Sequence, residues 1–271
     1  MPSDPLFGPT FTTPAIDAVV SGEAWLRAML RVEGALARAE AAAGLNPATS
    51  AEAITRACES APIDTAAIGR AAVDSMTPVV PLVAALRAAL PPALREHVHR
   101  GATSQDVLDT ATMLIACDAI GIIDGSLQAA MAAAARLAEA HRETPMVGRT
   151  LLKQAVPISF GLKAAGWLLG LLEARQELLR WRQEQPALQL GGAAGTLAPL
   201  GSAASLVEAR MAADLGLQLP PMPWHTRRTP IASLAAALGA VAAAAAKVAL
   251  DVALLAQDEV AEVREATAGT S

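Results

Sequence analysis

The sequence HRGATSQDVLDT (residues 99–110) concentrates polar and charged side chains in a chain otherwise dominated by alanine and leucine. It directly precedes residues 111–140, a long apolar run that predicts a helix. Gly101 ends the preceding segment, and a side-chain oxygen of Thr103 or Ser104 can cap the new helix. The first N–H groups of a helix lack internal acceptors and can bind an anion. The pattern therefore fits either an ordinary helix start, which local sequence favours, or a binding corner for a carboxylate.

The composition predicts an all-α protein. Hydrophobic residues make up 53% of the 271 residues, aromatic residues only 3%, and tyrosine is absent. Alanine-rich sequences favour helices, whereas strands favour aromatic and β-branched side chains. A net charge of −5 without a basic cluster argues against a nucleic-acid partner.

Cysteine and histidine usage bears on compartment and cofactors. Cys58 and Cys117 stand far apart, which indicates free thiols in a reducing compartment and hence the cytoplasm. The first residues lack the basic and apolar regions of a signal peptide. Four scattered histidines and two lone cysteines give no ligand spacing, so no metal is predicted. The glycine-rich segment 189–196 does not match a nucleotide-binding pattern, and no cofactor is predicted.

Three long helices are predicted, at about residues 111–140, 159–185 and 229–265, with shorter helices before and between them, one of which spans residues 21–43. We expect two domains: an N-terminal helical domain at residues 1–100 and a central long-helix bundle at residues 101–271.

The third long helix contains an apolar run, residues 231–255, that has the length of a membrane-spanning helix. Lys247 and Asp251 lie one helical turn apart inside it and are expected to form an ion pair. The charges favour a helix at the centre of a soluble bundle, so no membrane partner is predicted. Faces this rich in alanine need close neighbours on several sides, and we expect partner subunits to supply some of them.

Four polar segments resemble, in order, shared regions of the fumarase/aspartase/adenylosuccinate lyase superfamily. They read HRGATSQDVLDT at 99–110, GRTLLKQAVP at 148–157, GAAGT at 192–196 and WHTRR at 224–228. The last two resemble most the branch that contains the 3-carboxy-cis,cis-muconate cycloisomerases. The resemblance covers essentially the whole chain.

The resemblance implies a long-helix bundle of the fumarase/aspartase (L-aspartase-like) type. It also implies a homotetramer in which several subunits build each active site. The superfamily removes a proton beside a carboxylate without a cofactor, through an intermediate that cations and N–H donors stabilise. The site residues implied are His99 and Lys153 as catalytic groups, and Thr103, Ser104, Gln105, Arg149, Thr150, His225 and Arg228 as substrate-binding groups.

The chain departs from the superfamily pattern in three places. Leu151 stands where many of these lyases carry a histidine that protonates the leaving group. A carboxylate leaving group needs no such acid at neutral pH. Lys153 stands where glutamine is usual. It either pairs with an extra substrate carboxylate or is a solvent-exposed substitution without a role in binding. The signature loop with the serine thought to be the base is expected beyond Ser271, as is a C-terminal domain, so the chain is expected to be truncated and nearly inactive.

The resemblance, together with Leu151, implies a cycloisomerase that converts 3-carboxy-cis,cis-muconate, a small tricarboxylate, to a carboxymuconolactone in aromatic catabolism. Two alternatives stay open. One is another lyase of the superfamily, such as one acting on adenylosuccinate, against which Leu151 argues. The other is a non-catalytic helical scaffold, which the missing signature loop favours.

Overall fold

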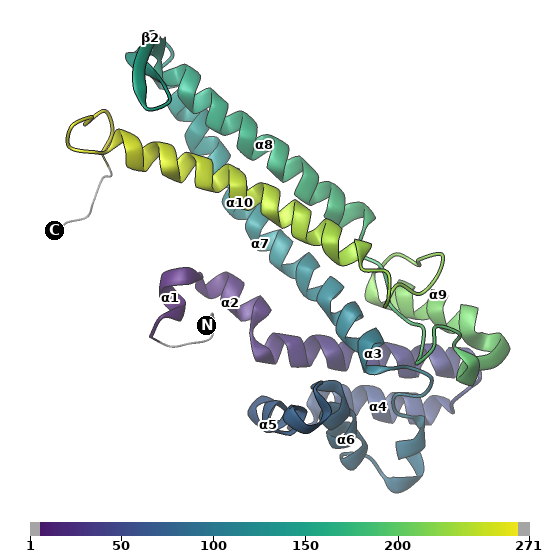
Figure 1. Ribbon diagram of the computed structural model, residues 1–271. Helices are drawn as coiled ribbons and strands as arrows, with labels where there is room; N and C mark the ends of the chain where they lie inside the picture. Colours follow the sequence, from purple (N-terminus) through teal and green to yellow (C-terminus); the bar gives the residue numbers. More distant parts are fainter. Residues whose placement is uncertain (1–5, 265–271) are drawn as a thin grey trace. The chain divides into compact units, whose positions relative to one another are not determined.

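The computed structural model of the chain describes residues 6–264 (Figure 1). These residues form two compact units. The first consists of the described residues up to Ile122 together with Arg182–Pro230, and the second of Ile123–Trp181 together with the described residues from Ile231 onward. The domain boundary expected at residue 100 stays a prediction.

In the first unit, helix α3 (Gly22–Ala42) packs against α4 (Ala48–Ser60) and α9 (Ala204–Leu215). The Ser21 hydroxyl accepts a hydrogen bond from the Ala24 amide and caps α3 at its start. The predicted helix at 21–43 is therefore confirmed. The remaining short elements are α1 (Gly8–Phe11), α2 (Pro14–Val20), α5 (Thr65–Ser75), α6 (Val79–Ala88), and the 3-10 helices η1 (Pro92–His97) and η2 (Ala198–Ala203).

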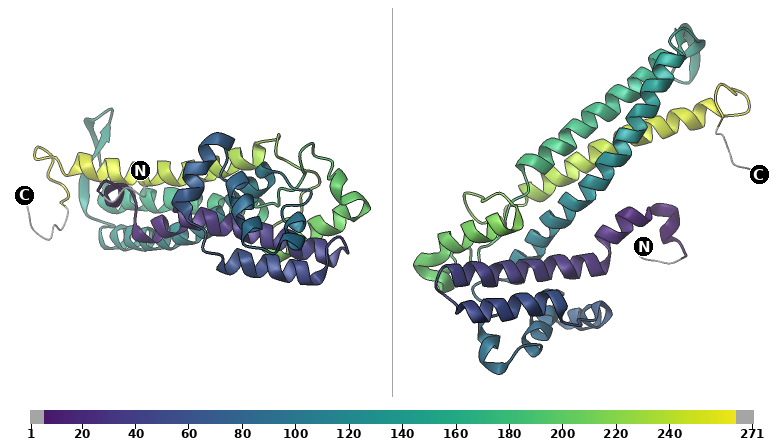
Figure 2. Two further views of the ribbon diagram at one scale, coloured as in Figure 1. Left: turned by 90° about the horizontal axis from the view of Figure 1, so that it is seen from below. Right: turned by 180° about the vertical axis from the view of Figure 1, so that it is seen from behind.

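The three predicted long helices are confirmed as α7 (Ser104–Ala140), α8 (Phe160–Glu184) and α10 (Thr229–Leu255). In the second unit their segments run alongside one another, as Figures 1 and 2 show. The buried side chains of Ala134, Ala164, Trp167 and Leu255 form a hydrophobic core there.

Helix α10 ends ten residues earlier than the sequence predicts. The Leu255 carbonyl accepts hydrogen bonds from the Glu262 and Val263 amides, so the chain turns back on itself after the helix. Among the described residues, α10 is the one helix long and apolar enough to cross a membrane by length and composition. Its Lys247 and Asp251 side chains form the expected ion pair.

A two-stranded antiparallel hairpin joins α7 to α8. Strand β1 (Pro145–Thr150) pairs with β2 (Lys153–Ser159), and Thr150 lies opposite Lys153. The two turn residues, Leu151 and Leu152, have φ values of 51° and 61°, which defines a type I′ turn. The sequence predicts no strand here, because leucine is not one of the Asn, Asp or Gly residues that mark such a turn.

We expect replacement of Leu151-Leu152 by Asn-Gly to stabilise the hairpin by about 1–3 kcal/mol, because leucine is strained at positive φ. The measurement is amide hydrogen exchange of the β1 and β2 ladder. The double variant Leu151→Ala/Leu152→Ala, which removes apolar surface but keeps the strain, is the control. Equal protection in the parent and the Asn-Gly variant would contradict the expected strain.

Candidate functional site

The polar segment before α7 forms a capped helix start in the first unit. The Thr103 amide donates to Asp106 Oδ2 at 3.0 Å, so the capping bond comes from the third residue of the helix. The sequence predicts instead a cap from the Thr103 or Ser104 side chain. Among residues 6–264, the side chains of Thr103, Ser104 and Gln105 form no hydrogen bond, and the Ser104 and Gln105 amides have no acceptor. All three residues are partly exposed, so these groups stay open to a ligand.

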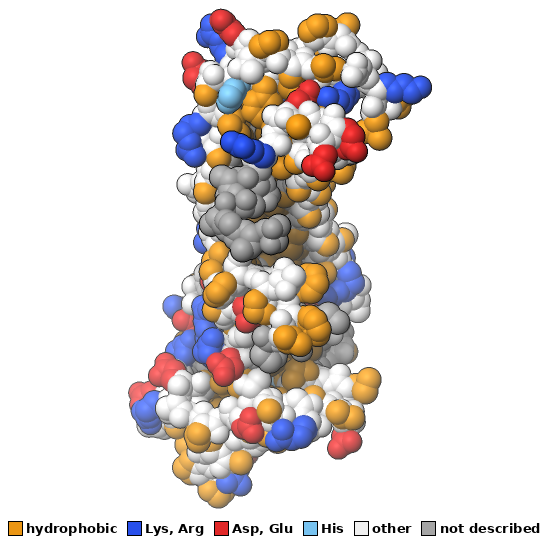
Figure 3. Space-filling model, turned by 90° about the vertical axis from the view of Figure 1, so that its left-hand side faces the viewer, with side chains coloured by type: hydrophobic (Ala, Val, Ile, Leu, Met, Phe, Trp, Pro, Cys, Tyr) orange, Lys and Arg blue, Asp and Glu red, His pale blue; other side chains and the backbone are white. Residues whose placement is uncertain are grey.

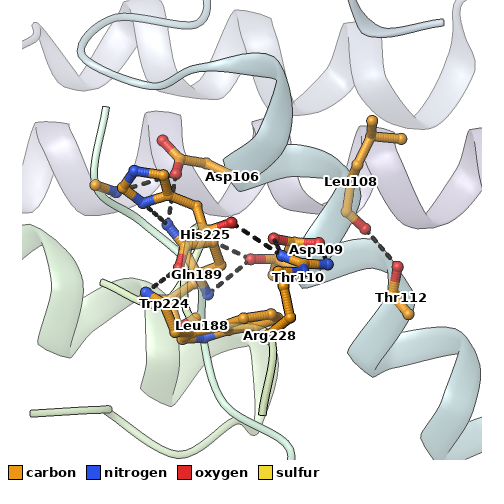
Figure 4. A network of polar contacts seen from close by, with 11 residues as sticks. Asp106, Leu108, Asp109, Thr110, Thr112, Leu188, Gln189, Trp224, His225 and Arg228 are labelled. Carbon is orange, nitrogen blue, oxygen red and sulfur yellow. Dashed lines mark hydrogen bonds and ion pairs between the residues drawn. The ribbon is translucent and has the colours of Figure 1, made fainter. Parts of the chain in front are cut away.

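Asp106 is the centre of a buried polar network (Figure 4). Its side chain is buried, and its two carboxylate oxygens accept four hydrogen bonds of 2.8–3.1 Å. The donors are the Thr103, Gly191 and Gly192 amides and Gln189 Nε2. Burial raises the pKa of Asp106, and these hydrogen bonds oppose the rise. The carboxylate thus joins the start of α7 to the glycine-rich loop 191–196.

Gln189 uses its backbone and side chain to fix this loop. Its backbone N–H donates to Thr110 Oγ1 at 3.0 Å, and the Thr110 hydroxyl donates to its carbonyl at 2.9 Å. Its side-chain Oε1 accepts from the Trp224 amide at 2.6 Å, while Nε2 lies 3.3 Å from His225 Nδ1. The segments at 106–110, 189–192 and 224–225 are therefore held in one cluster.

Two glycines bring the loop close to its neighbours. Gly192 has a φ of 65°, and a Cβ there would lie 2.7 Å from the Gly101 carbonyl oxygen. A Cβ on Gly195, whose φ is 77°, would lie 3.3 Å from His225 Cε1. Because both positions need the left-handed region and little volume, they favour glycine.

Arg228 is held beside the cluster by a buried partner. Its guanidinium donates twice to the Asp109 carboxylate, at 2.6 and 2.9 Å, and lies 5.5 Å from the centre of the Trp224 ring. Hydrogen bonds to Asp109 raise the pKa of Arg228, so it stays a cation. The Asp109 side chain is buried, whereas the Arg228 side chain is 44% exposed and can still face an anion.

His99 belongs to the first unit as well. Its Nδ1 lies 2.5 Å from Oε1 of Glu33, a fully buried residue of α3. His99 has a φ of 61°, an unusual backbone conformation for a non-glycine residue. This contact between His99 and Glu33 joins α3 to the loop that leads into the start of α7.

The other predicted site residues lie in the second unit. Arg149 donates to both oxygens of Glu262, at 2.7 and 2.9 Å. Thr150 and Lys153 are exposed opposite each other beside the hairpin turn. The structure therefore places His99, Thr103, Ser104, Gln105, His225 and Arg228 in one unit and Arg149, Thr150 and Lys153 in the other.

Two residues that organise the site are absent from the predicted set. Gln189 and Glu33 lie 83 and 66 residues away from their partners Asp106 and His99. Gln189 is the first residue of the glycine-rich segment 189–196, and this segment is the one sequence signal that could have drawn attention to it. Within residues 6–264, no group of three or more His, Cys, Asp or Glu side chains could hold a metal ion.

Comparison with known proteins finds relatives that match nearly the whole chain. The chain matches the family described as "Lyase" over residues 4–271. It is 47% identical over 264 residues to a 3-carboxy-cis,cis-muconate cycloisomerase of Bradyrhizobium diazoefficiens, covering 96% of this chain and 58% of the relative. It is 46% identical to a nitrosuccinate lyase of Streptomyces davaonensis, and that match covers 96% of this chain and 57% of the relative.

The crystal structure of the 3-carboxy-cis,cis-muconate lactonizing enzyme from Pseudomonas putida superposes with a TM-score of 0.91 at 41% identity. That match covers 95% of this chain and 59% of the enzyme. The chain thus spans less than two thirds of the length of these relatives. The predicted fold class is confirmed, and the chain belongs to the lyase family, the fumarase/aspartase/adenylosuccinate lyase superfamily that its four polar segments resemble.

Proposed function

We propose that this chain is the part of a cytoplasmic cycloisomerase that binds the carboxylates of 3-carboxy-cis,cis-muconate. The observation that carries the proposal is the open start of α7. The Ser104 and Gln105 amides and the Thr103 and Ser104 hydroxyls are unpaired among the described residues, and the Arg228 cation lies in the same unit. Such donors suit a carboxylate in both charge and geometry.

The reaction is an isomerisation in which one carboxylate oxygen bonds to an alkene carbon and a proton joins the neighbouring carbon. The reverse reaction breaks the same carbon–oxygen bond and returns the carboxylate. Because a carboxylate leaves without being protonated at neutral pH, no acid is needed at that position. Leu151, 93% exposed at the hairpin turn, has no acid group to offer and so fits this chemistry.

A second candidate is the elimination of nitrite from nitrosuccinate. The 46% identical Streptomyces relative carries that name. Nitrite is a weak base, so this reaction also proceeds without an acid at position 151. The two candidates share the carboxylate-binding corner and differ in the bond that breaks.

The test supplies each substrate to the longest polypeptide that the gene expresses. Loss of 3-carboxy-cis,cis-muconate is followed by ultraviolet absorbance, and nitrite release from nitrosuccinate by a colorimetric assay. We expect the first reaction to be the faster. Turnover of nitrosuccinate alone would replace the proposal with the second candidate, and turnover of adenylosuccinate would overturn both.

In the same polypeptide we expect Ser104→Ala to lower kcat/KM for the muconate by about 10–100-fold, because one hydrogen bond to a charged group is worth about 1.5–3 kcal/mol. The matched control is Ser205→Ala, on the exposed surface of α9 in the same unit. Equal kcat/KM for the two variants would remove Ser104 from the site.

We also propose that copies of the chain assemble into a homotetramer, with α10 among the buried helices and active sites shared between subunits. In support, only 6% of the residues in the most apolar 18-residue stretch of α10 are buried within one chain. Leu238 and Leu250 are both exposed on this helix. An apolar surface of this length is characteristic of a contact site.

We expect Leu250→Glu to reduce the mass measured by light scattering below that of a tetramer, because it places a charge on the contact surface. Val73→Glu, at an exposed apolar position of α5 in the first unit, is the control and leaves the mass unchanged. A monomeric parent, or a tetrameric Leu250→Glu variant, would contradict the assembly.

A further inference from the structure

The hydrogen bonds of Gln189 determine how its side-chain amide is oriented. The Trp224 backbone N–H can only donate, so the amide oxygen must be the atom 2.6 Å from it. Nε2 then lies on the other side, 2.8 Å from Asp106 Oδ1 and 3.3 Å from His225 Nδ1. A flipped amide would set two N–H donors against each other at Trp224 and two oxygens against each other at Asp106.

The amide nitrogen of Gln189 has two hydrogens and two neighbours that can accept them. One hydrogen is directed to the Asp106 carboxylate and the other to His225 Nδ1. An Nδ1 that accepts this hydrogen carries no proton itself, and the proton of a neutral imidazole then resides on Nε2. Figure 4 shows the Asp106, Gln189 and His225 side chains converging at this point.

The orientation of the imidazole ring follows from the same hydrogen bond. Its Cε1 lies beside Gly195, where an added Cβ would approach it to 3.3 Å. A ring turned by 180° would place a carbon in front of the Gln189 N–H and lose the hydrogen bond. Among residues 6–264, Nε2 forms no hydrogen bond, and the ring is only partly buried.

We propose that Gln189 is a positioning residue that holds His225 as the Nε2–H tautomer, so that the ring presents a hydrogen-bond donor to an anionic ligand. Asp106 Oδ1 accepts a hydrogen bond from the Gln189 side-chain amide, and the Trp224 backbone N–H determines how that side-chain amide is oriented. The anionic ligand is the substrate carboxylate of the proposed function. The role of His225 as a donor to a ligand therefore rests on that proposed function. The tautomer itself is a property of the free protein.

The test is nitrogen NMR of the 271-residue protein labelled with ¹⁵N-histidine, at alkaline pH where an ordinary imidazole is neutral. Two-bond proton–nitrogen correlations show which ring nitrogen carries the proton. The chain has four histidines, and the His225 signals are those missing from His225→Asn. We expect a protonated Nε2 and an unprotonated Nδ1. A proton on Nδ1, or an even mixture of tautomers, would overturn the proposal.

Two variants show whether Gln189 causes the preference. In Gln189→Glu the N–H is replaced by an acceptor, so we expect the proton to move to Nδ1. Thr110→Val is the matched control, because it removes the backbone anchor of Gln189 and keeps the amide, and we expect the tautomer to be unchanged. A folded Gln189→Glu protein with the proton still on Nε2 would contradict the role of Gln189.

If Gln189→Glu does not fold, Gln189→Met is measured in its place. We expect this variant to give a mixture of the two His225 tautomers. A pure Nε2–H form in Gln189→Met would contradict the role of Gln189. No part of the test uses turnover, so its failure and that of the proposed function are distinguishable.

Discussion

Replacement of Asp106 by asparagine is expected to lower the free energy of unfolding of the first unit by about 2–5 kcal/mol. The buried carboxylate accepts four hydrogen bonds, two on each oxygen. An asparagine amide has one oxygen and one NH₂ group, so in either orientation two of the donors face another donor. Each unsatisfied buried donor costs about 1–3 kcal/mol. The loss affects both the start of α7 and the loop at 191–192.

The measurement is urea denaturation of parent and variant. It is followed by tryptophan fluorescence, to which buried Trp224 contributes; the Nε1–H of this residue donates to the Leu188 carbonyl beside the network. Asp118→Asn, on the exposed side of α7, is the matched control. We expect it to change the free energy of unfolding by no more than about 0.5 kcal/mol. If Asp106→Asn unfolds at the same urea concentration as the parent, the network does not hold this part of the first unit together.

The sequence predicts the long helices because their signals are local and repeated over many residues. Residues 111–140 carry a helical apolar run long enough to outweigh any single residue, and α7 spans it entirely. The predicted ion pair of Lys247 and Asp251, which depends only on helical spacing, is likewise confirmed.

The hairpin and the organisation of the site could not be predicted in this way. Leu151 and Leu152 give no turn signal, and the strands beside them are too short to show a period. Gln189 and Glu33 act through partners more than 60 residues away, and only the fold brings them together. The roles predicted for Thr103, Ser104, Gln105, His225 and Arg228 rest on a family resemblance, and their placement in one unit comes from the structure.

The second large effect concerns Glu40, a buried residue of α3. Its Oε2 accepts a hydrogen bond from Asn46, and its Oε1 is buried without a partner among the described residues. Burial raises the pKa of Glu40 from 4.5 to about 8, although the Arg100 charge and the Asn46 hydrogen bond oppose the rise. A raised pKa means that the folded protein prefers the protonated carboxyl. The associated stability is fully present below pH 4.5 and is lost as the pH rises through about 8.

Glu40→Gln is expected to remove this pH dependence, because glutamine keeps an acceptor for Asn46 and cannot ionise. At pH 9 we expect the variant to be more stable than the parent by roughly 3–5 kcal/mol, and at pH 5 by much less. Urea denaturation at pH 5, 7 and 9 measures the difference. Glu52→Gln on the exposed side of α4 is the control and leaves the pH profile of the parent intact. Parallel profiles for the parent and Glu40→Gln would mean that Glu40 is ionised in the folded protein throughout this range, with Arg100 compensating its charge.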